Sequence, residues 1–357
     1  MKRHSERLES DQGAVLVMVA LMMTMLLGVG ALVIDLGAIY VEKRQLQNGA
    51  DAAVLAVAQD CAGGNCGSAS VTANKYADLN ANDSLSNVDT VCGVGPGLTA
   101  CTDPAPPNIP AGTGWVRAKT STETSGGGTQ VKFLLAPIMN ALAGATVRAT
   151  AVAAWGAVGT ATTVPLTFSQ CEFEKFGGTV PDPVTGLGGV VPTGINTIYF
   201  HTSVQATTCP ASPSGGDGPG GFGWLAAFTN CLTTISAGGW VDVSTGVSTP
   251  SACHPADWRD KDLVLAIFDE TNFGTGNNLK YHVLGLAAFH VTGYSFTGGG
   301  ADGFYSLGGE FSKAKQLCSL SPGGSGICIR GYFTKVSTSA DDLGGPSLGV
   351  TTIKMVG

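Results

Sequence analysis

The feature that most constrains this chain is a run near its N-terminus, Ala14 to Ile34, that contains no charged residue. As an α-helix, these 21 residues would extend roughly 30 Å, the thickness of the hydrocarbon core of a bilayer. A cleaved secretory signal usually has a shorter apolar stretch of ~7–15 residues followed by a small-residue cleavage site. Here the helical pattern runs on instead. We therefore expect a retained, single-pass membrane anchor.

The cysteines indicate which side of the membrane the rest of the chain occupies. Lys and Arg before and after the span favour a cytoplasmic N-terminus only slightly. All 10 cysteines follow the span, and disulfides persist outside the cytoplasm. We therefore expect a protein of the cell membrane with a cytoplasmic N-terminus and extracytoplasmic C-terminal domains.

Composition narrows the functional classes. Only 13% of the residues are charged and the net charge is −7. A nucleic-acid binder needs a basic surface, and a coiled-coil rod or a charged disordered tail needs more charge. Hydrophobic residues make up 44% of the chain, enough for a real core. These numbers predict a folded protein that does not bind nucleic acid.

An amphipathic pattern continues beyond the span. Apolar residues recur at steps of three and four up to Gly63–Gly64, which predicts that the membrane helix extends to that point. We expect this extension to pack on the proximal domain through one stripe: Leu36, Ile39, Tyr40 and Leu46. The segments expected next are a helix at 71–82, a loop at 92–112, a strand at 115–122, a short helix at 133–143 and a strand at 147–154.

From Thr163 onward, short apolar runs alternate with turn residues, which predicts a mainly β region. Leu263 to Phe268 is apolar at every position and suits a strand that is covered on both faces. The expected strands are 164–168, 197–201, 263–269, 281–296, 327–336 and 350–356.

Each of the two regions contains an even number of cysteines, which makes pairing within each region the simplest hypothesis and leaves the connectivity open. The candidates are Cys61, Cys66, Cys92, Cys101, Cys171, Cys209, Cys231, Cys253, Cys318 and Cys328.

Together these patterns predict an α+β chain with a long N-terminal transmembrane helix, a proximal α+β domain and a mainly β distal domain stapled by disulfides. The expected divisions are a cytoplasmic tail at 1–13, the transmembrane helix at 14–34, the helical extension and proximal domain at 35–162, and the distal domain at 163–357.

The order of features around the span resembles the N-terminal module of TadE/TadG-like proteins, which belong to the Tad (tight adherence) system that assembles Flp-type pili in bacteria. The features that carry this resemblance are Gln12-Gly13 before the span, Asp35 just after it, Tyr40, the run Arg44-Gln45-Leu46-Gln47 and the run Ala50-Asp51-Ala52-Ala53. The Cys-rich region after Thr163 is similar to the C-terminal region of actinobacterial members.

The resemblance implies a membrane-anchored structural or assembly component of a Tad/Flp pilus, with a pilin-like proximal domain and other Tad/Flp proteins as partners. Prepilin-type processing would cut between Gly13 and Ala14 and usually uses a Glu five residues into the mature chain. That position is Met18 here, which favours a TadG-type anchor over a processed major pilin.

Some residue patterns are typical of catalytic or metal sites, but each is also explained by an ordinary turn, loop or strand. The sequence Gly345–Gly349 matches the Gly-x-Ser-x-Gly pattern around Ser347, but no acidic residue or His follows it to complete a triad, so a turn before the last strand is expected. His254, Asp257, Asp260 and Asp262 are too few for a Ca²⁺ or Zn²⁺ site by themselves. His282 and His290 would share one face of an uninterrupted strand. We expect no enzyme, no cofactor and no bound metal.

Two other functions compete with a pilus component. The chain could be an anchored surface adhesin whose distal domain binds a surface ligand independently of any pilus. An anchored hydrolase would require Ser347 to be a nucleophile. Neighbouring genes for a secretion ATPase and a membrane platform would favour the pilus interpretation.

Overall fold

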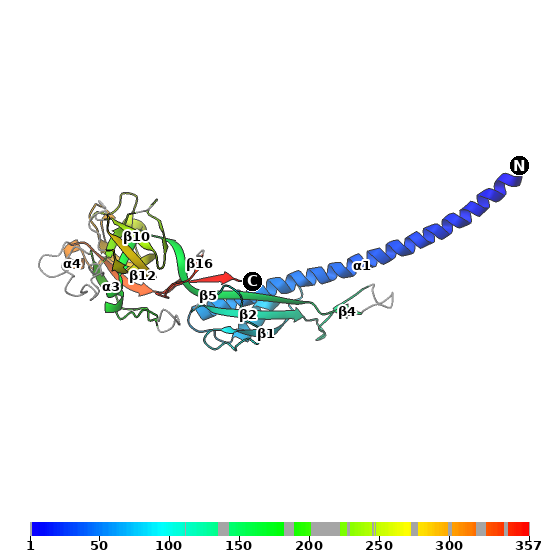
Figure 1. Ribbon diagram of the computed structural model, residues 1–357, viewed down its shortest axis with the longest axis horizontal. Coiled ribbons are helices and arrows are strands. Elements are labelled where there is room, and N and C mark those ends of the chain that lie inside the picture. Colours follow the sequence, from blue (N-terminus) through cyan, green and yellow to red (C-terminus); the bar gives the residue numbers. More distant parts are fainter. Residues whose placement is uncertain are drawn as a thin grey trace.

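The computed structural model describes residues 2–110, 112–134, 143–181, 189–200, 222–226, 229–244, 246, 248–272, 278–298, 302–318, 326–338 and 342–356, with only the helical backbone described at 2–14. The molecule is elongated (Figure 1). A long helix projects from one end, a proximal sheet lies against its second half, and a distal sheet forms the other end.

Helix α1 (Lys2–Ala62) is a single helix of 61 residues. It ends where the sequence predicts, because Gly63 and Gly64 follow and Gly64 adopts φ +101°, a conformation that side chains with a Cβ rarely adopt. A tight loop closed by the Cys61–Cys66 disulfide leads to α2 (Ala69–Leu79), which packs back on α1.

The proximal sheet is mostly antiparallel and has the order β1-β2-β5-β17-β15. Its strands are β1 (Ser86–Val94), β2 (Gly114–Thr122), β5 (Arg148–Thr163), β17 (Val350–Met355) and β15 (Val336–Ser337). Helix α1 packs against β2, β5 and β17. Alanines of α1 and β5, such as Ala53 and Ala151, contribute to this core, and their small side chains let the helix lie close to the sheet.

The distal sheet has the order β10-β8-β6-β11-β12-β14-β7. The strands are β6 (Leu166–Ser169), β7 (Asn196–Tyr199), β8 (Phe222–Leu225), β10 (Trp240–Ser244), β11 (Asp262–Thr271), β12 (Lys280–Ser295) and β14 (Cys328–Thr334). As expected, β11 is covered on both faces: Leu265 and Ile267 belong to one core cluster and Ala266 to another. Aromatic side chains fill the larger cluster, including Phe168, Phe289 and Phe333 in edge-to-face contacts.

Short elements complete the fold. Strand β9 (Thr233–Ser236) and β16 (Asp342–Leu343) both pair with β5, and β13 (Phe304–Ser306) pairs with β12. Strands β3 (Val131–Lys132) and β4 (Gly144–Ala145) form a separate hairpin. In the described part of the chain, the short helices are α3 (Gln170–Lys175), α4 (Ala314–Leu317) and two 3₁₀ turns at Pro255–Trp258 and Leu307–Gly309.

Several expected elements differ from the structure. Strand β1 occupies Ser86–Val94, so the first residues of the expected loop at 92–112 are in a strand. Most of the short helix expected at 133–143 lies outside the described residues. Its described ends are hydrogen-bonded to each other: the amide of Phe133 donates to the carbonyl of Ala143 at 3.0 Å.

The division expected at Thr163 does not separate the two sheets. Strand β5 continues to Thr163, beyond the predicted end at 154, and pairs near that end with β9, which comes from the expected distal domain. The last strand, β17, was expected in the distal domain, but it returns to the proximal sheet, where Ile353 pairs with Trp155 of β5. Hydrogen bonding to β5 therefore places the last strand in the proximal sheet.

Disulfides staple both parts of the chain. Pairing is local: Cys61–Cys66 and Cys92–Cys101 in the proximal part, and Cys231–Cys253 and Cys318–Cys328 in the distal part. Cys171 is disulfide-bonded as well, and Cys209 lies outside the described residues.

Candidate functional site: the membrane helix and its junction with the proximal sheet

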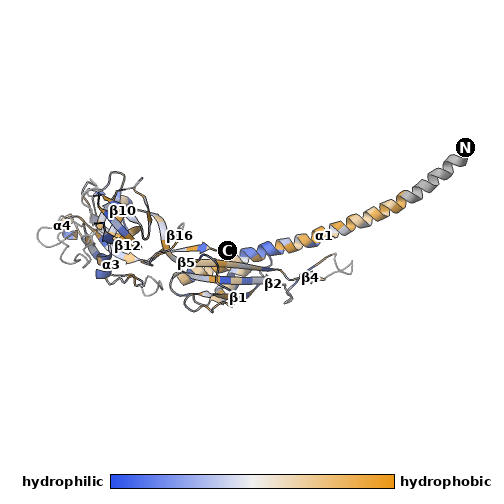
Figure 2. Ribbon diagram, viewed as in Figure 1, coloured by the Kyte–Doolittle hydropathy of each residue, from blue (hydrophilic) through white to orange (hydrophobic). Residues whose placement is uncertain are grey.

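The N-terminal half of α1 has almost no protein around it. From Val15 to Ile34 nearly every side chain is exposed, and Ala31 is the one buried residue among them. Figure 2 shows the coloured part of this half as a hydrophobic stretch outside the sheets. The helix is long and apolar enough to cross a membrane. Gly13 and Ala14 lie inside the helix, at the start of this stretch.

The second half of α1 buries one face against the sheet. The buried positions recur at helical spacing as Ala31, Asp35, Leu46, Ala50, Ala53, Val54, Val57, Ala58 and Cys61. Of the four residues predicted to form the packing stripe, Leu46 is buried and Ile39 is partly buried against the same core. Leu36 and Tyr40 lie on the outer face instead, with 55% and 63% of their surface exposed. The prediction chose the correct period but included residues from two faces.

Asp35 joins the helix to the hairpin β3–β4. Its Oδ1 accepts a hydrogen bond from the backbone amide of Leu134 at 2.8 Å, and Asp35 itself is only 6% exposed. The carboxylate therefore holds the end of the described hairpin at the position where the uncharged run of α1 stops. The sequence places Asp35 directly after the uncharged run, but nothing local could indicate a partner 99 residues away.

Polar side chains between Asp35 and Asp51 fasten α1 to the sheet. The hydroxyl of Thr120 donates to the carbonyl of Leu46 at 3.1 Å inside the core. Gln47 donates to the carbonyl of Thr150 at 3.2 Å, and Lys43 donates to the carbonyl of Arg148. These bonds fix the helix against β2 and β5, and the last two also satisfy backbone carbonyls of β5.

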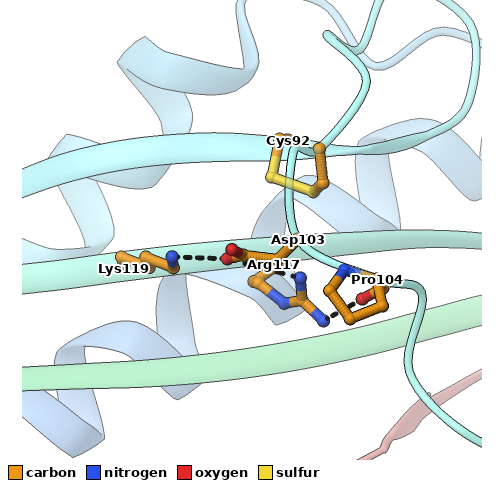
Figure 3. Close-up of a disulfide and its surroundings, with 6 residues drawn as sticks. Cys92, Asp103, Pro104, Arg117 and Lys119 are labelled. Atoms are coloured by element: carbon orange, nitrogen blue, oxygen red, sulfur yellow. Dashed lines mark hydrogen bonds and ion pairs between the residues drawn. A yellow bond between two sulfur atoms is a disulfide. The ribbon is translucent and has the colours of Figure 1, made fainter.

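A strap covers the other face of the proximal sheet. Its described residues are 95–110 and 112. It is closed at its start by the Cys92–Cys101 disulfide, and Cys101 and Ile109 pack near Trp115. Figure 3 shows how charges tie it to β2: Asp103 accepts from Lys119 at 2.5 Å and lies 3.7 Å from Arg117.

Arg117 also donates to the carbonyl of Pro104 at 2.9 Å, so one strand holds two consecutive strap residues. The hydrogen bond and the charge of Lys119 lower the pKa of the Asp103 carboxyl. The strap is therefore fastened by an ionised carboxylate.

The candidate ligand residues of the distal sheet are paired with one another. His290 contacts Asp262 through Nδ1 at 2.7 Å and Asp260 through Nε2 at 3.0 Å, and its ring stacks on Tyr332. His282 contacts Asp269 at 2.6 Å.

The two histidines do not form a pair on one face, because register shifts between β11 and β12 interrupt the alternation between them. His254 and Asp257 lie at the 3₁₀ turn Pro255–Trp258. Among the described residues, no group of three or more His, Cys, Asp or Glu side chains is placed to hold a metal ion.

A groove of about 630 Å³ lies where the end of α1 meets both sheets. Ser347, the serine of the Gly-x-Ser-x-Gly pattern, is in its lining together with Lys335, Trp155 and Pro181. The described lining residues include no His, Asp or Glu that could act as a base. The segment Gly345–Gly349 forms the turn before β17, with positive φ at both end glycines.

Comparison with known proteins finds one similarity, and it covers the helix described above. Residues 13–60 match the family "Putative Flp pilus-assembly TadE/G-like". The matched segment is a part of α1 and ends two residues before the helix does. No curated protein and no solved structure matches the chain.

Proposed function

We propose that this protein is a membrane-anchored, extracytoplasmic component of a Tad/Flp pilus, with a minor-pilin-like structural or assembly role. One observation carries the proposal. The segment similar to pilus-assembly proteins is one continuous helix that is bare and apolar in its first half and forms the core of a folded domain in its second half. Such a helix can hold a domain at the membrane and remain accessible to neighbouring helices.

The N-terminus lies in the cytoplasm and the two sheets lie outside. The disulfides in both parts support this orientation, because such bonds persist in an oxidising compartment. Lys43 and Arg44 follow the span, so the proposed orientation depends on the disulfides rather than on charge.

Two faces of α1 are suited to other Tad/Flp helices. Inside the span, Gly28 and Gly30 have no atoms near the position of a Cβ, and small residues let helices approach closely in lipid. Above the span, Leu36, Tyr40 and Val41 expose apolar surface away from the sheet. The distal sheet lies at the far end of the molecule, where it can present a surface to other pilus proteins or to a surface ligand (Figure 1).

The test is mass spectrometry of sheared surface fibres and of membranes, reading the N-terminus of this protein in each. A chain that retains the residues before Gly13 and is found with Tad/Flp proteins in either fraction supports an anchored pilus component. A chain that begins at Ala14 in the fibres supports a processed minor pilin.

If the protein still binds a surface ligand in membranes that lack the pilus machinery, that result would favour the independent adhesin and overturn the proposal. That experiment needs the full chain. A fragment starting at residue 163 would contain β17 without β5, its partner in the structure.

A further inference from the structure

We propose that the hairpin β3–β4 is a second membrane contact, which sits in the outer lipid interface beside the transmembrane helix. This inference rests on the proposed membrane anchor. It assigns a lipid-binding role to a hairpin that has no part in either sheet.

The depth of the hairpin is fixed by Asp35. Asp35 is the first charged residue after the uncharged run Ala14–Ile34, so it marks where α1 leaves the hydrocarbon core. The amide of Leu134 is bound to its carboxylate at 2.8 Å, which places Leu134 at the same level. Asp35 is only 6% exposed, so the hairpin shields its carboxylate at the boundary between water and lipid.

The hairpin points toward the membrane. Its base is the pairing of Val131 with Ala145 and of Lys132 with Gly144, and Val131 packs on the core beneath α1. From this base the hairpin extends along α1 toward its N-terminal half (Figure 1). The first described arm of the hairpin ends at Leu134, whose amide is bound to Asp35. The second begins at Ala143, whose carbonyl accepts a hydrogen bond from the amide of Phe133.

The exposed surface at this level is apolar. Leu134, two residues beyond the end of β3, has 71% of its surface exposed. Lys132, on the strand side, is exposed and suits lipid phosphates, as a long cationic side chain does at an interface. A surface of this composition fits the boundary between headgroups and acyl chains.

The test places a fluorophore at three positions of the full chain in lipid nanodiscs. Each variant introduces one cysteine at an exposed residue: Leu134→Cys, Met25→Cys in the middle of the span, and Leu79→Cys at the end of α2. The described native cysteines are all disulfide-bonded, so the label enters at the new thiol under non-reducing conditions. Lipids carrying a nitroxide near the carbonyls or near the end of the acyl chain serve as shallow and deep quenchers.

We expect the label at residue 134 to lose emission with the shallow quencher, and the label at residue 25 to lose emission with the deep quencher. The label at residue 79 should keep its emission with both. In addition, Asp35→Ala should reduce the shallow quenching at residue 134 and leave the deep quenching at residue 25 unchanged.

The outcomes separate this inference from the proposed anchor. Failure of quenching at residue 25 would overturn the anchor itself. Quenching at residue 25 without quenching at residue 134 would overturn the hairpin contact alone. Disulfide-linked dimers of Leu134→Cys without quenching would show that a second copy, not lipid, covers this surface.

Discussion

Gly49 of α1 lies directly against the backbone of Ala77 in α2. A Cβ added at Gly49 would come within 3.2 Å of the Ala77 carbonyl oxygen and 3.3 Å of its Cα. Both contacts are with backbone, which cannot rotate away as a flexible side chain can. The absence of a side chain at this position therefore sets how closely the two helices pack.

We expect Gly49→Leu to separate α1 from α2 and to lower the free energy of unfolding by roughly 1–3 kcal/mol. Gly37→Leu is the matched control, because Gly37 is in the same helix and has nothing within 4 Å of its Cβ position. It should be neutral or stabilising, since Leu has a higher helix propensity than Gly. Denaturant unfolding of the full chain in detergent measures both, and equal loss in the two variants would contradict the packing argument.

The two faces of α1 should respond differently to truncation. Leu46→Ala removes a buried side chain and should cost about 2–5 kcal/mol of stability. Leu36→Ala is on the outer face and should change stability by less than about 0.5 kcal/mol.

If the outer face binds partner helices, Leu36→Ala will instead reduce recovery of the protein with Tad/Flp proteins. Normal recovery of both Leu36→Ala and Tyr40→Ala would exclude this face as a partner surface.

Fastening of the strap should depend on pH. The pKa of Asp103 is lowered in the folded protein by Lys119, so its stabilising effect is present above the ordinary carboxyl pKa of 3.8 and is lost as the pH falls through the lowered value. Asp103→Asn should therefore loosen residues 95–112 at neutral pH, as acid does in the wild type.

Hydrogen exchange of the strap amides measures this effect. Asp242→Asn breaks a similar surface ion pair with Lys280 in the distal part and is the control. Unchanged strap exchange in Asp103→Asn would show that the disulfide alone holds the strap.

Tyr281 should make the protein sensitive to alkali. Its side chain is fully buried and stacked on Phe268, and its hydroxyl has no hydrogen-bond partner in the described part of the chain. Burial raises the pKa of Tyr281 to about 12 from its ordinary value of 10.0. Its contribution to stability is therefore complete below pH 10 and falls as the pH rises from 10 toward 12, by roughly 2–3 kcal/mol.

Tyr281→Phe should remove this alkaline loss and leave neutral stability unchanged or slightly higher, because no hydrogen bond is lost. Unfolding of the two proteins at about pH 8 and about pH 11 tests this expectation. The partly exposed Tyr76→Phe is the control and should lose stability with alkali as the wild type does.

The sequence predicted most of the elements because their signals are local. Two glycines predict the end of α1. A short run that is apolar at every position predicts β11, because such a run suits a strand that is covered on both faces. The anchor follows from length and the absence of charge. The sequence also predicted the helical period of the buried stripe on α1. It assigned Leu36 and Tyr40 to the wrong face, because steps of three and four residues fit more than one adjacent face of a helix.

The features that the sequence did not predict depend on contacts between distant residues. The pairing of β17 with β5, the hydrogen bond from Leu134 to Asp35 and the charges that hold the strap all join segments far apart in the chain. No local pattern distinguishes a last strand that joins the distal sheet from one that returns to the proximal sheet. The register shifts that separate His282 from His290 are likewise a property of the paired strands and not of either sequence.

Strand β5 also determines how a load would pass through the molecule. Its covalent backbone runs from the proximal sheet to the distal part, and β2 and β17 flank it as antiparallel neighbours. A pull on the distal sheet, resisted at the membrane, would be directed along β5, and the hydrogen bonds on both of its sides would be sheared together rather than opened one after another. The strand that joins the two sheets would thus be the element that carries tension between them.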